Sequence, residues 1–417
     1  MHAVHRLEGG IAMPLALLAL ALGAFAIGTT EFVIMGLLPE VATDLGVPIS
    51  TAGYLISAYA LGVVIGAPLL TALGTRLPRK TMLLVFMGVF LVGNLATVIT
   101  SSYGAVFASR VLAGLPHGAY LGLAALVAAH LAGPARRATA VARVMLGLTV
   151  ANIVGVPAGT LLGQLLGWRV AFLVVVALSA LTIVGVARFV PHTPASRVGG
   201  LRGELSALRH PQVILGLTTA VFGFAGVFAV YSYISPMMTE LAGMPSTGVP
   251  IVLALFGVGM TLGSLVVGPI ADRWLRPTIY VSLGSLAVVL ALFTLTVHNP
   301  WTAAATVVVL GAVGFGVTAP LQVLVMSKAE AAPTIASATN HSAFNLANAG
   351  GAWLGGLGIG MGLGYVSPAV IGVVLALVGL GIAVTAGLVD REGSGNEPSS
   401  EHRDSAEGPV STPVAHG

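Results

Sequence analysis

Long apolar stretches, separated by short polar segments, dominate the chain. About twelve of these windows hold the roughly 20 mostly apolar residues that a helix needs to cross the hydrocarbon core of a bilayer. The windows lie near residues 14–38, 50–74, 81–100, 105–131, 142–166, 169–190, 213–239, 247–271, 278–297, 301–325, 337–361 and 366–389. Because backbone polar groups in lipid must be satisfied within the segment, the pattern predicts an all-α membrane protein with twelve transmembrane helices.

The pattern repeats once along the chain, with a fixed offset of 197 residues. Two short basic turns, 76–80 and 272–276, each join a pair of apolar windows. Proline, glycine and arginine hold the same register around them, in the pairs Pro39 and Pro236, Gly46 and Gly243, Pro48 and Pro245, Gly62 and Gly259, Gly66 and Gly263, and Arg79 and Arg276. Parallel repeats of six helices are one way in which secondary transporters are built. We therefore expect two pseudo-symmetric six-helix bundles.

The segments between the windows predict the domain boundaries and the orientation. The two bundles should span 1–190 and 213–389, joined by a linker at 191–212 that is rich in Pro, Gly and Arg. Residues 390–417 are rich in Gly, Ser, Glu and Pro, which is typical of a disordered tail. When the windows alternate across the membrane, 16 of the 18 Lys and Arg residues fall on one side, so both termini should be cytoplasmic. The two exceptions are Arg169 and Arg110.

Composition excludes several classes of protein. With 56% hydrophobic and 8% charged residues and a mean hydropathy of +0.99, the chain has too little polar surface for a water-soluble body. The solvent of most of the chain is therefore the lipid bilayer of a cell (inner or plasma) membrane. The basic residues are dispersed in short loops, so we expect no nucleic-acid partner. We also expect a monomer. The absence of cysteine excludes disulfides and thiolate metal sites.

Several motifs resemble the major facilitator superfamily. The turn from Gly268 to Arg276 resembles its loop signature, as does the stretch 71–80, although Thr75 stands where the family usually has an Asp. The resemblance implies that the two loops take part in conformational change. The residues to which it assigns that role are Arg76, Arg79, Lys80, Asp272, Arg273 and Arg276.

Two further stretches are similar to one branch of this superfamily. Residues 147–163, which contain Gly155, Pro157 and Gly159, look like a variant of the motif of proton-driven antiporters. The glycine spacing of four makes a smooth helix face, and Pro157 lets the helix bend, so this segment is a candidate for close packing, for gating or for both. Stretches 28–46 and 110–118 look like twelve-helix drug:proton antiporters, a group that includes chloramphenicol-resistance and arabinose-efflux-type permeases. The resemblance implies export of a small amphipathic molecule in exchange for protons.

Two charged residues, Glu31 and Arg110, lie well inside apolar windows. A rise of 1.5 Å per residue places them about 12 Å and about 8 Å below the outer helix ends, at similar depth. Their counterparts at the 197-residue offset are Phe228 and Val307, so the charges are confined to the first half. Because desolvation favours the neutral form of a carboxyl, Glu31 is the candidate proton site, with Arg110 as its partner. The alternative is a neutral Glu31 bonded to a backbone group and an Arg110 that reaches the outer headgroups.

A polar stripe marks the eleventh window. His341, Asn345 and Asn348 are spaced i, i+4 and i+7 and share one helix face, so they should line a cavity and bind substrate or bond a neighbouring helix. Weaker candidates for the same pocket are Asn152, Tyr231, Tyr233 and Gln322. His117 shares a face with Arg110 and is a candidate hydrogen-bond partner or proton carrier.

The sequence has none of the motifs of an ATP-driven pump or a metalloenzyme. It contains no phosphate-binding loop and no His-Glu-x-x-His site, and Glu31 has no second acid at its level. We therefore expect no cofactor, no metal and no enzymatic activity. The alternatives are a sugar, nucleoside or amino-acid permease on the same fold, an intramembrane enzyme, and a passive channel or receptor.

Overall fold

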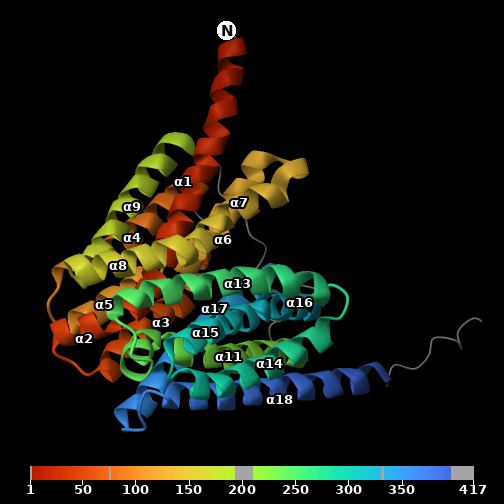
Figure 1. Cartoon of the computed structure of the whole chain (residues 1–417). Coiled ribbons are helices and arrows are strands. Elements are labelled where there is room, and N and C mark those ends of the chain that lie inside the picture. The colour runs from red at the N-terminus through yellow and green to blue at the C-terminus, as the bar shows by residue number, and fades with distance from the viewer. Residues whose placement is uncertain (1, 75–76, 193–209, 330–332, 396–417) are drawn as a thin grey trace, which may run out of the picture.

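The computed structural model describes residues 2–74, 77–192, 210–329 and 333–395. Arg76, residues 193–209 of the predicted linker and residues 396–417 of the predicted tail lie outside the described residues. Within those ranges the regular elements are helices (Figure 1), as predicted.

The first half contains α1 (His2–Gly36), α2 (Leu38–Leu45), α3 (Ile49–Gly74), α4 (Arg79–Ile99), α5 (Tyr103–Gly114), α6 (His117–Ala132), η1 (Pro134–Arg136), α7 (Arg137–Val150), η2 (Ala151–Gly155), α8 (Val156–Leu166) and α9 (Trp168–Phe189). The second half contains α11 (Pro211–Tyr231), α12 (Ile234–Pro236), η3 (Met237–Leu241), η4 (Ser246–Gly248), α13 (Val249–Ala271), α14 (Leu275–Thr296), α15 (Pro300–Gly316), α16 (Thr318–Lys328), α17 (Pro333–Gly360) and α18 (Ser367–Gly395).

Eleven spans of the described chain are long and apolar enough to cross a membrane. They match eleven of the twelve predicted windows. The remaining window, the eleventh (337–361), corresponds to α17, whose 28 residues are long enough to span but include the polar stripe of His and Asn.

Two helix ends differ from the predicted windows. Helix α1 begins at His2, well before residue 14, and α18 continues to Gly395, into the segment predicted as a disordered tail. An apolar window measures the thickness of the bilayer core, whereas a helix can continue into water beyond it. At the end of α18, Asp390 also bonds to two neighbouring helices, which holds this turn in place.

Several membrane crossings are built from two helical pieces instead of one. The first crossing breaks after Gly36, and α2 then starts with Pro39 in its first turn, where a missing N–H costs no helical hydrogen bond. The corresponding crossing of the second half breaks after Tyr231 and restarts before Pro236. The two breaks occupy equivalent places in the two halves because the prolines are in register.

The same glycine contacts recur in both halves. A side chain at Gly62 would collide with the carbonyl oxygen of Val111, and one at Gly259 with that of Val308. Gly66 and Gly263 face the carbonyls of Leu115 and Ala312 in the same way, so every pair is offset by 197 residues. Only a residue without a Cβ permits this approach of the second helix of each half to the fourth.

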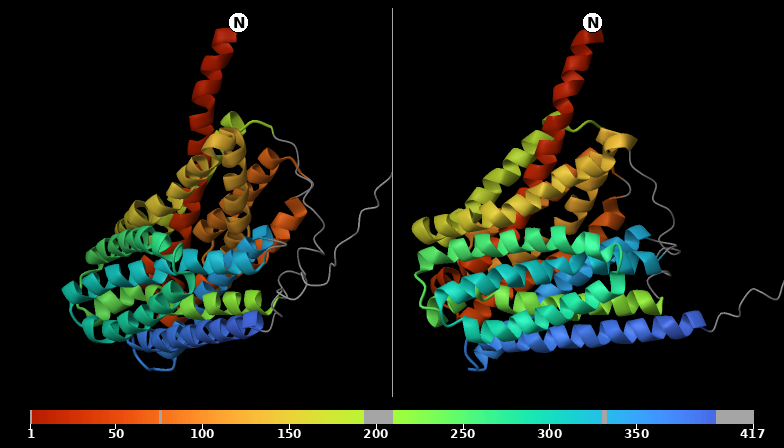
Figure 2. Two further views of the ribbon diagram at one scale, coloured as in Figure 1. Left: turned by 90° about the vertical axis from the view of Figure 1, so that its right-hand side faces the viewer. Right: turned by 45° about the vertical axis from the view of Figure 1, so that its right-hand side comes forward.

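The two halves meet on the side assigned to the outside by the basic residues. In Figures 1 and 2 the helices of the second half run side by side, and α1, α7 and α9 rise from them at an angle. Ser57 on α3 donates to the carbonyl of Ala349 on α17 (2.9 Å), and Gln164 on α8 donates to the carbonyl of Ser246 (3.0 Å). Both bonds involve the outer parts of these helices.

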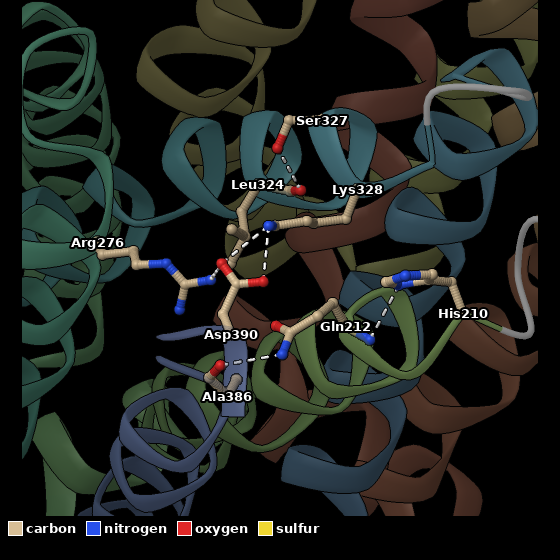
Figure 3. A network of polar contacts seen from close by, with 8 residues as sticks. All are labelled: His210, Gln212, Arg276, Leu324, Ser327, Lys328, Ala386 and Asp390. Atoms are coloured by element: carbon tan, nitrogen blue, oxygen red, sulfur yellow. Dashed lines mark hydrogen bonds and ion pairs between the residues drawn. The ribbon is translucent and has the colours of Figure 1, made fainter. Parts of the chain in front are cut away.

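Ion pairs join helices at the cytoplasmic end of the second half and at the outer end of the first half. On the cytoplasmic side Asp390 accepts from Lys328 (2.7 Å) and Arg276 (2.5 Å), which ties α18 to α16 and α14 (Figure 3). On the outer side Arg169 pairs with Asp44 (2.5 Å), and the guanidinium holds the pKa of that carboxyl below its usual range. This pair provides a reason for the single basic residue predicted on the outer side.

Candidate functional site

Glu31 lies between the two halves. It sits on α1 among buried apolar neighbours, and only 9% of its surface is exposed. Its Oε1 accepts a hydrogen bond from Nδ2 of Asn348 on α17, at 3.5 Å. The acid of the first half is therefore bonded to the polar stripe of the second half.

Arg110 on α5 is completely buried. Its Nη1 donates to Oγ1 of Thr30 (3.2 Å), and its Nη2 donates to the carbonyl of Thr30 (3.0 Å). The guanidinium also lies over the rings of Tyr59 (4.5 Å) and Phe172 (5.2 Å). The alternative in which Arg110 reaches the outer headgroups is therefore wrong, because the side chain is enclosed by protein.

Glu31 and Arg110 interact through Thr30 and through their charges. The ion pairs within the described residues do not include these two, yet each side chain lies within the electrostatic field of the other. The alternative prediction for Glu31 is a hydrogen bond to a backbone group. The bond in the structure is instead to the side chain of Asn348.

A buried polar network surrounds this pair. Thr30 donates from Oγ1 to Oδ1 of Asn94 (2.6 Å), and the hydroxyl of Tyr59 bonds Nδ1 of His117 (3.0 Å). The sequence analysis missed Asn94 and Tyr59 because it searched for charges. The available indication was that an Asn and a Tyr occur within windows that are otherwise apolar.

The predicted polar stripe is only partly buried. His341 is exposed, Asn345 is half-buried and Asn348 is buried. Asn345 donates from Nδ2 to the carbonyl of His341 (3.0 Å). Asn152 on η2 does the same to the carbonyl of Leu148 (2.9 Å) and is buried. Asn348 and Asn152 thus reach the region between the halves from α17 and from the crossing that contains α7 and α8.

The other three of the four weaker candidates have different surroundings. Tyr231 is buried and stacks on Phe256, with ring centroids 3.8 Å apart. Tyr233 donates to the carbonyl of Ala352 (2.8 Å). Gln322 accepts from Asn340 (3.0 Å), which is a bond between α16 and α17 within the second half.

An aromatic cluster, which the sequence analysis did not predict, lies beside Glu31. It comprises Phe224, Phe228, Tyr231, Phe256, Phe315 and Phe344, all in the second half. Phe32, the residue after Glu31, joins it across the interface by stacking on Phe228 (6.2 Å) and meeting the edge of Tyr231 (6.0 Å). The six rings of the second half come from four helices, so their spacing along the sequence gives no indication of the cluster.

The glycine segment packs on α1. A Cβ at Gly159 would lie 2.9 Å from Val33, and one at Gly163 would lie 2.6 Å from Leu37. Just before Pro157 the backbone is π-helical over Ala151–Gly155, a local widening that is often found at functional sites. The prediction of close packing is confirmed, and the role of Gly155, Pro157 and Gly159 in gating stays a prediction.

The loop residues occupy the cytoplasmic ends of helices. Lys80 donates to the carbonyl of Ala187 at the end of α9 (2.7 Å), and Arg276 pairs with Asp390. Arg79 is half-buried, and Asp272 and Arg273 are exposed. Their roles in conformational change stay predictions. Within the described residues, no group of three or more His, Cys, Asp or Glu is arranged to hold a metal ion.

Comparisons with known proteins agree with this architecture. Residues 20–352 match the model of the Major Facilitator Superfamily. The chain is 42% identical over 360 residues to the "Inner membrane transport protein YdhP" of Escherichia coli K12, covering 86% of this chain and 92% of the relative. It is 34% identical over 360 residues to the "Chloramphenicol resistance protein" of Streptomyces lividans, covering 85% of this chain and 92% of the relative.

A solved structure shows the same fold. The chain superposes with a TM-score of 0.72 on a bacterial homologue of the human lysosomal transporter Spinster, at 16% identity, covering 92% of this chain and 98% of that one. The relatives are transporters, so the alternative of an intramembrane enzyme is wrong. The chain is a multi-pass membrane protein that works in the lipid bilayer on a small-molecule substrate, and it belongs to the Major Facilitator Superfamily of secondary transporters.

Proposed function

We propose that this transporter is an antiporter that exports a small amphipathic molecule in exchange for protons. The observation that carries the proposal is the bond from Asn348 to Glu31, because it joins a titratable group of one half to the other half. The similarity to a protein named for chloramphenicol resistance supports a drug or drug-like metabolite as the exported molecule.

Protonation of Glu31 changes the contact between the halves. The ionised carboxylate accepts from Asn348 and is attracted by the guanidinium of Arg110. When the carboxyl binds a proton, its charge disappears, and a charge-assisted hydrogen bond becomes a weaker neutral one. The balance between the two arrangements of the halves then depends on whether Glu31 carries a proton.

The buried guanidinium of Arg110 stays with Glu31 in the first half. Arg110 is fixed to α1 through Thr30 and to α3 through Tyr59, so its charge remains beside Glu31 when the halves move. A proton from the outside can therefore be accepted when the outer contacts open and released when the inner side opens.

The bonds seen here define one state of the cycle. The bonds from Ser57 to Ala349 and from Gln164 to Ser246 lie on the outer side, and they must break before the outer side can open. Each proton that moves through 100 mV supplies about 2.3 kcal/mol. At about 1.4 kcal/mol per decade this sustains a substrate gradient of more than tenfold.

The test is Glu31→Gln, which keeps the size of the side chain and removes its proton site. A drug-susceptibility panel in an efflux-deficient bacterium should identify the exported compounds, and everted vesicles should then report uphill transport. We expect Glu31→Gln to bind substrate and to lose transport driven by a proton gradient. Full export by Glu31→Gln across such a gradient would reject the role of Glu31.

Glu240→Gln is the matched control, since Glu240 is an exposed acid on η3 at the outer end of the second half. It should transport like the wild type. The same vesicles distinguish an exporter from a sugar, nucleoside or amino-acid permease, because an importer would accumulate substrate with the opposite proton gradient.

A further inference from the structure

We propose that the substrate presents hydrogen-bond donors, such as hydroxyl or amine N–H groups, at one end and an apolar ring at the other, and that anions are excluded. This inference rests on the proposed transport site and names its substrate class. It comes from three buried acceptor oxygens without a donor, which belong to Asn348, the partner of Glu31, to Asn345 on the same helix face, and to Asn152 on η2.

Three asparagines, one of which bonds Glu31, each have a buried side-chain oxygen without a donor. The oxygens are Oδ1 of Asn152, Asn345 and Asn348. In Asn152 and Asn345 the amide nitrogen donates to the carbonyl four residues earlier, and in Asn348 it donates to Glu31. These bonds fix which amide atom is nitrogen, so the atom that remains unpaired is the acceptor in all three.

Asn94 shows how such an oxygen is normally satisfied. It is buried, and its Nδ2 donates to the carbonyl of Phe90 four residues earlier (2.9 Å), as in Asn152 and Asn345. Its Oδ1 accepts from the hydroxyl of Thr30 at 2.6 Å. A buried acceptor without such a donor is costly, so three of them, one on the residue that bonds Glu31, indicate positions that a ligand's donors satisfy.

The helices that carry the three asparagines also meet the aromatic cluster. Asn345 and Asn348 share a face of α17, and Phe344 of the cluster precedes Asn348 by four residues, so it lies on the same side of the helix. The backbone of Asn152 lies against Gly257, the neighbour of Phe256. A ligand held by the acceptors would therefore place its apolar part against rings.

Charge argues against an anionic ligand. One of the three asparagines, Asn348, bonds the carboxyl group of Glu31, which repels an anion when it is ionised. The Nε of Arg110 also lacks a partner, but the guanidinium is completely buried under Tyr59, Phe172 and Thr30. It therefore serves the carboxyl and not an external anion.

The experiment compares four probes with a common phenyl ring on the full-length protein in detergent, by calorimetry or by the shift in melting temperature. The probes are 3-phenyl-1,2-propanediol, its dimethyl ether, 3-phenylpropylamine and 3-phenylpropanoate. We expect the diol and the amine to bind, and the ether and the carboxylate to bind about tenfold more weakly or not at all.

Variants then assign the effect to the acceptors. Asn152→Leu and Asn345→Leu should each weaken binding of the diol about fivefold to tenfold while leaving the already weak binding of the ether unchanged. The control is Asn299→Ser, since the Oδ1 of Asn299 already caps α15 and a serine can replace it. Melting temperatures without ligand report whether each variant is folded.

Three outcomes would overturn the inference: an ether that binds as tightly as the diol, a carboxylate that binds most tightly, or no binding by the diol and the amine. The failure of the proposed function is separate. If Glu31→Gln abolishes proton-driven export but the protein prefers the ether, the transport proposal stands and the proposed substrate class is rejected. If the protein prefers the diol but Glu31→Gln exports normally, the substrate class stands and the role of Glu31 in transport is rejected.

Discussion

The two halves of this transporter have the same scaffold and different chemistry. Gly62 approaches the carbonyl of Val111 in the first half as Gly259 approaches that of Val308 in the second. At the same offset, however, the positions of Glu31 and Arg110 are occupied by Phe228 and Val307. A duplicated bundle therefore keeps the positions where backbones touch, because no other residue fits there, while buried positions that contact other side chains are free to diverge.

Under the proposed function, this divergence gives the two halves different tasks. The first half holds the buried acid, the buried arginine and their Thr, Asn and Tyr partners. The second half holds the six-ring cluster and the polar stripe that reaches Glu31. We infer that protons are bound by the first half and that the apolar part of the substrate is bound mainly by the second.

The largest expected effect comes from removing the guanidinium of the first half. Arg110→Ala should abolish proton-driven transport in proteoliposomes, because it leaves the carbonyl of Thr30 and Glu31 without their cationic partner. Arg110→Lys should recover only part of the rate, since an ammonium cannot reproduce two parallel N–H bonds to Thr30. Transport is measured per folded molecule, after size-exclusion chromatography.

Val307→Ala, at the equivalent position of the second half, is the control. Val307 is buried, so the change should lower the melting temperature, yet transport per folded molecule should continue. If Val307→Ala stopped transport as completely as Arg110→Ala, the division of tasks between the halves would be wrong.

A smaller effect is expected from the glycine contacts that recur within each half. Gly62→Ala and Gly259→Ala should each destabilise the protein by about 1–3 kcal/mol or more, because the new methyl group meets a backbone carbonyl that cannot move aside. The two losses should be similar if the scaffold is truly repeated. Chemical unfolding in detergent measures both.

Gly88→Ala provides the matched comparison. Gly88 lies in α4, and a Cβ there would meet no atom within 4 Å. Its replacement should be neutral or stabilise by about 0.5–1 kcal/mol, as alanine favours helix over glycine. Equal destabilisation at Gly62 and Gly88 would show that close approach to a carbonyl does not set the cost of the substitution at Gly62.

The sequence predicted the features that depend on local pattern or on repetition. Hydropathy predicted twelve windows, eleven of which coincide with apolar spans and one with α17, and the offset of 197 residues located the glycines that touch carbonyls. It also singled out Glu31 and Arg110, because charge within an apolar window is rare. The phenylalanine cluster and the partner of Asn348 could not be predicted, since those contacts join helices that no pattern in one sequence pairs.

The smallest effect concerns how each half holds the end of its last helix. In the first half Lys80 bonds a backbone carbonyl of α9, whereas in the second half Arg276 and Lys328 pair with Asp390 of α18. Asp390→Asn should therefore destabilise by about 1 kcal/mol at low salt, because the side chains are a quarter or more exposed and the variant leaves two cations close together. The loss should shrink at high salt, which screens both attraction and repulsion. Lys80→Met should have a smaller and less salt-dependent effect, because its partner carries no full charge. Unfolding midpoints of both variants at two salt concentrations test this difference, and equal salt dependence would show that the two helix ends are held in the same way.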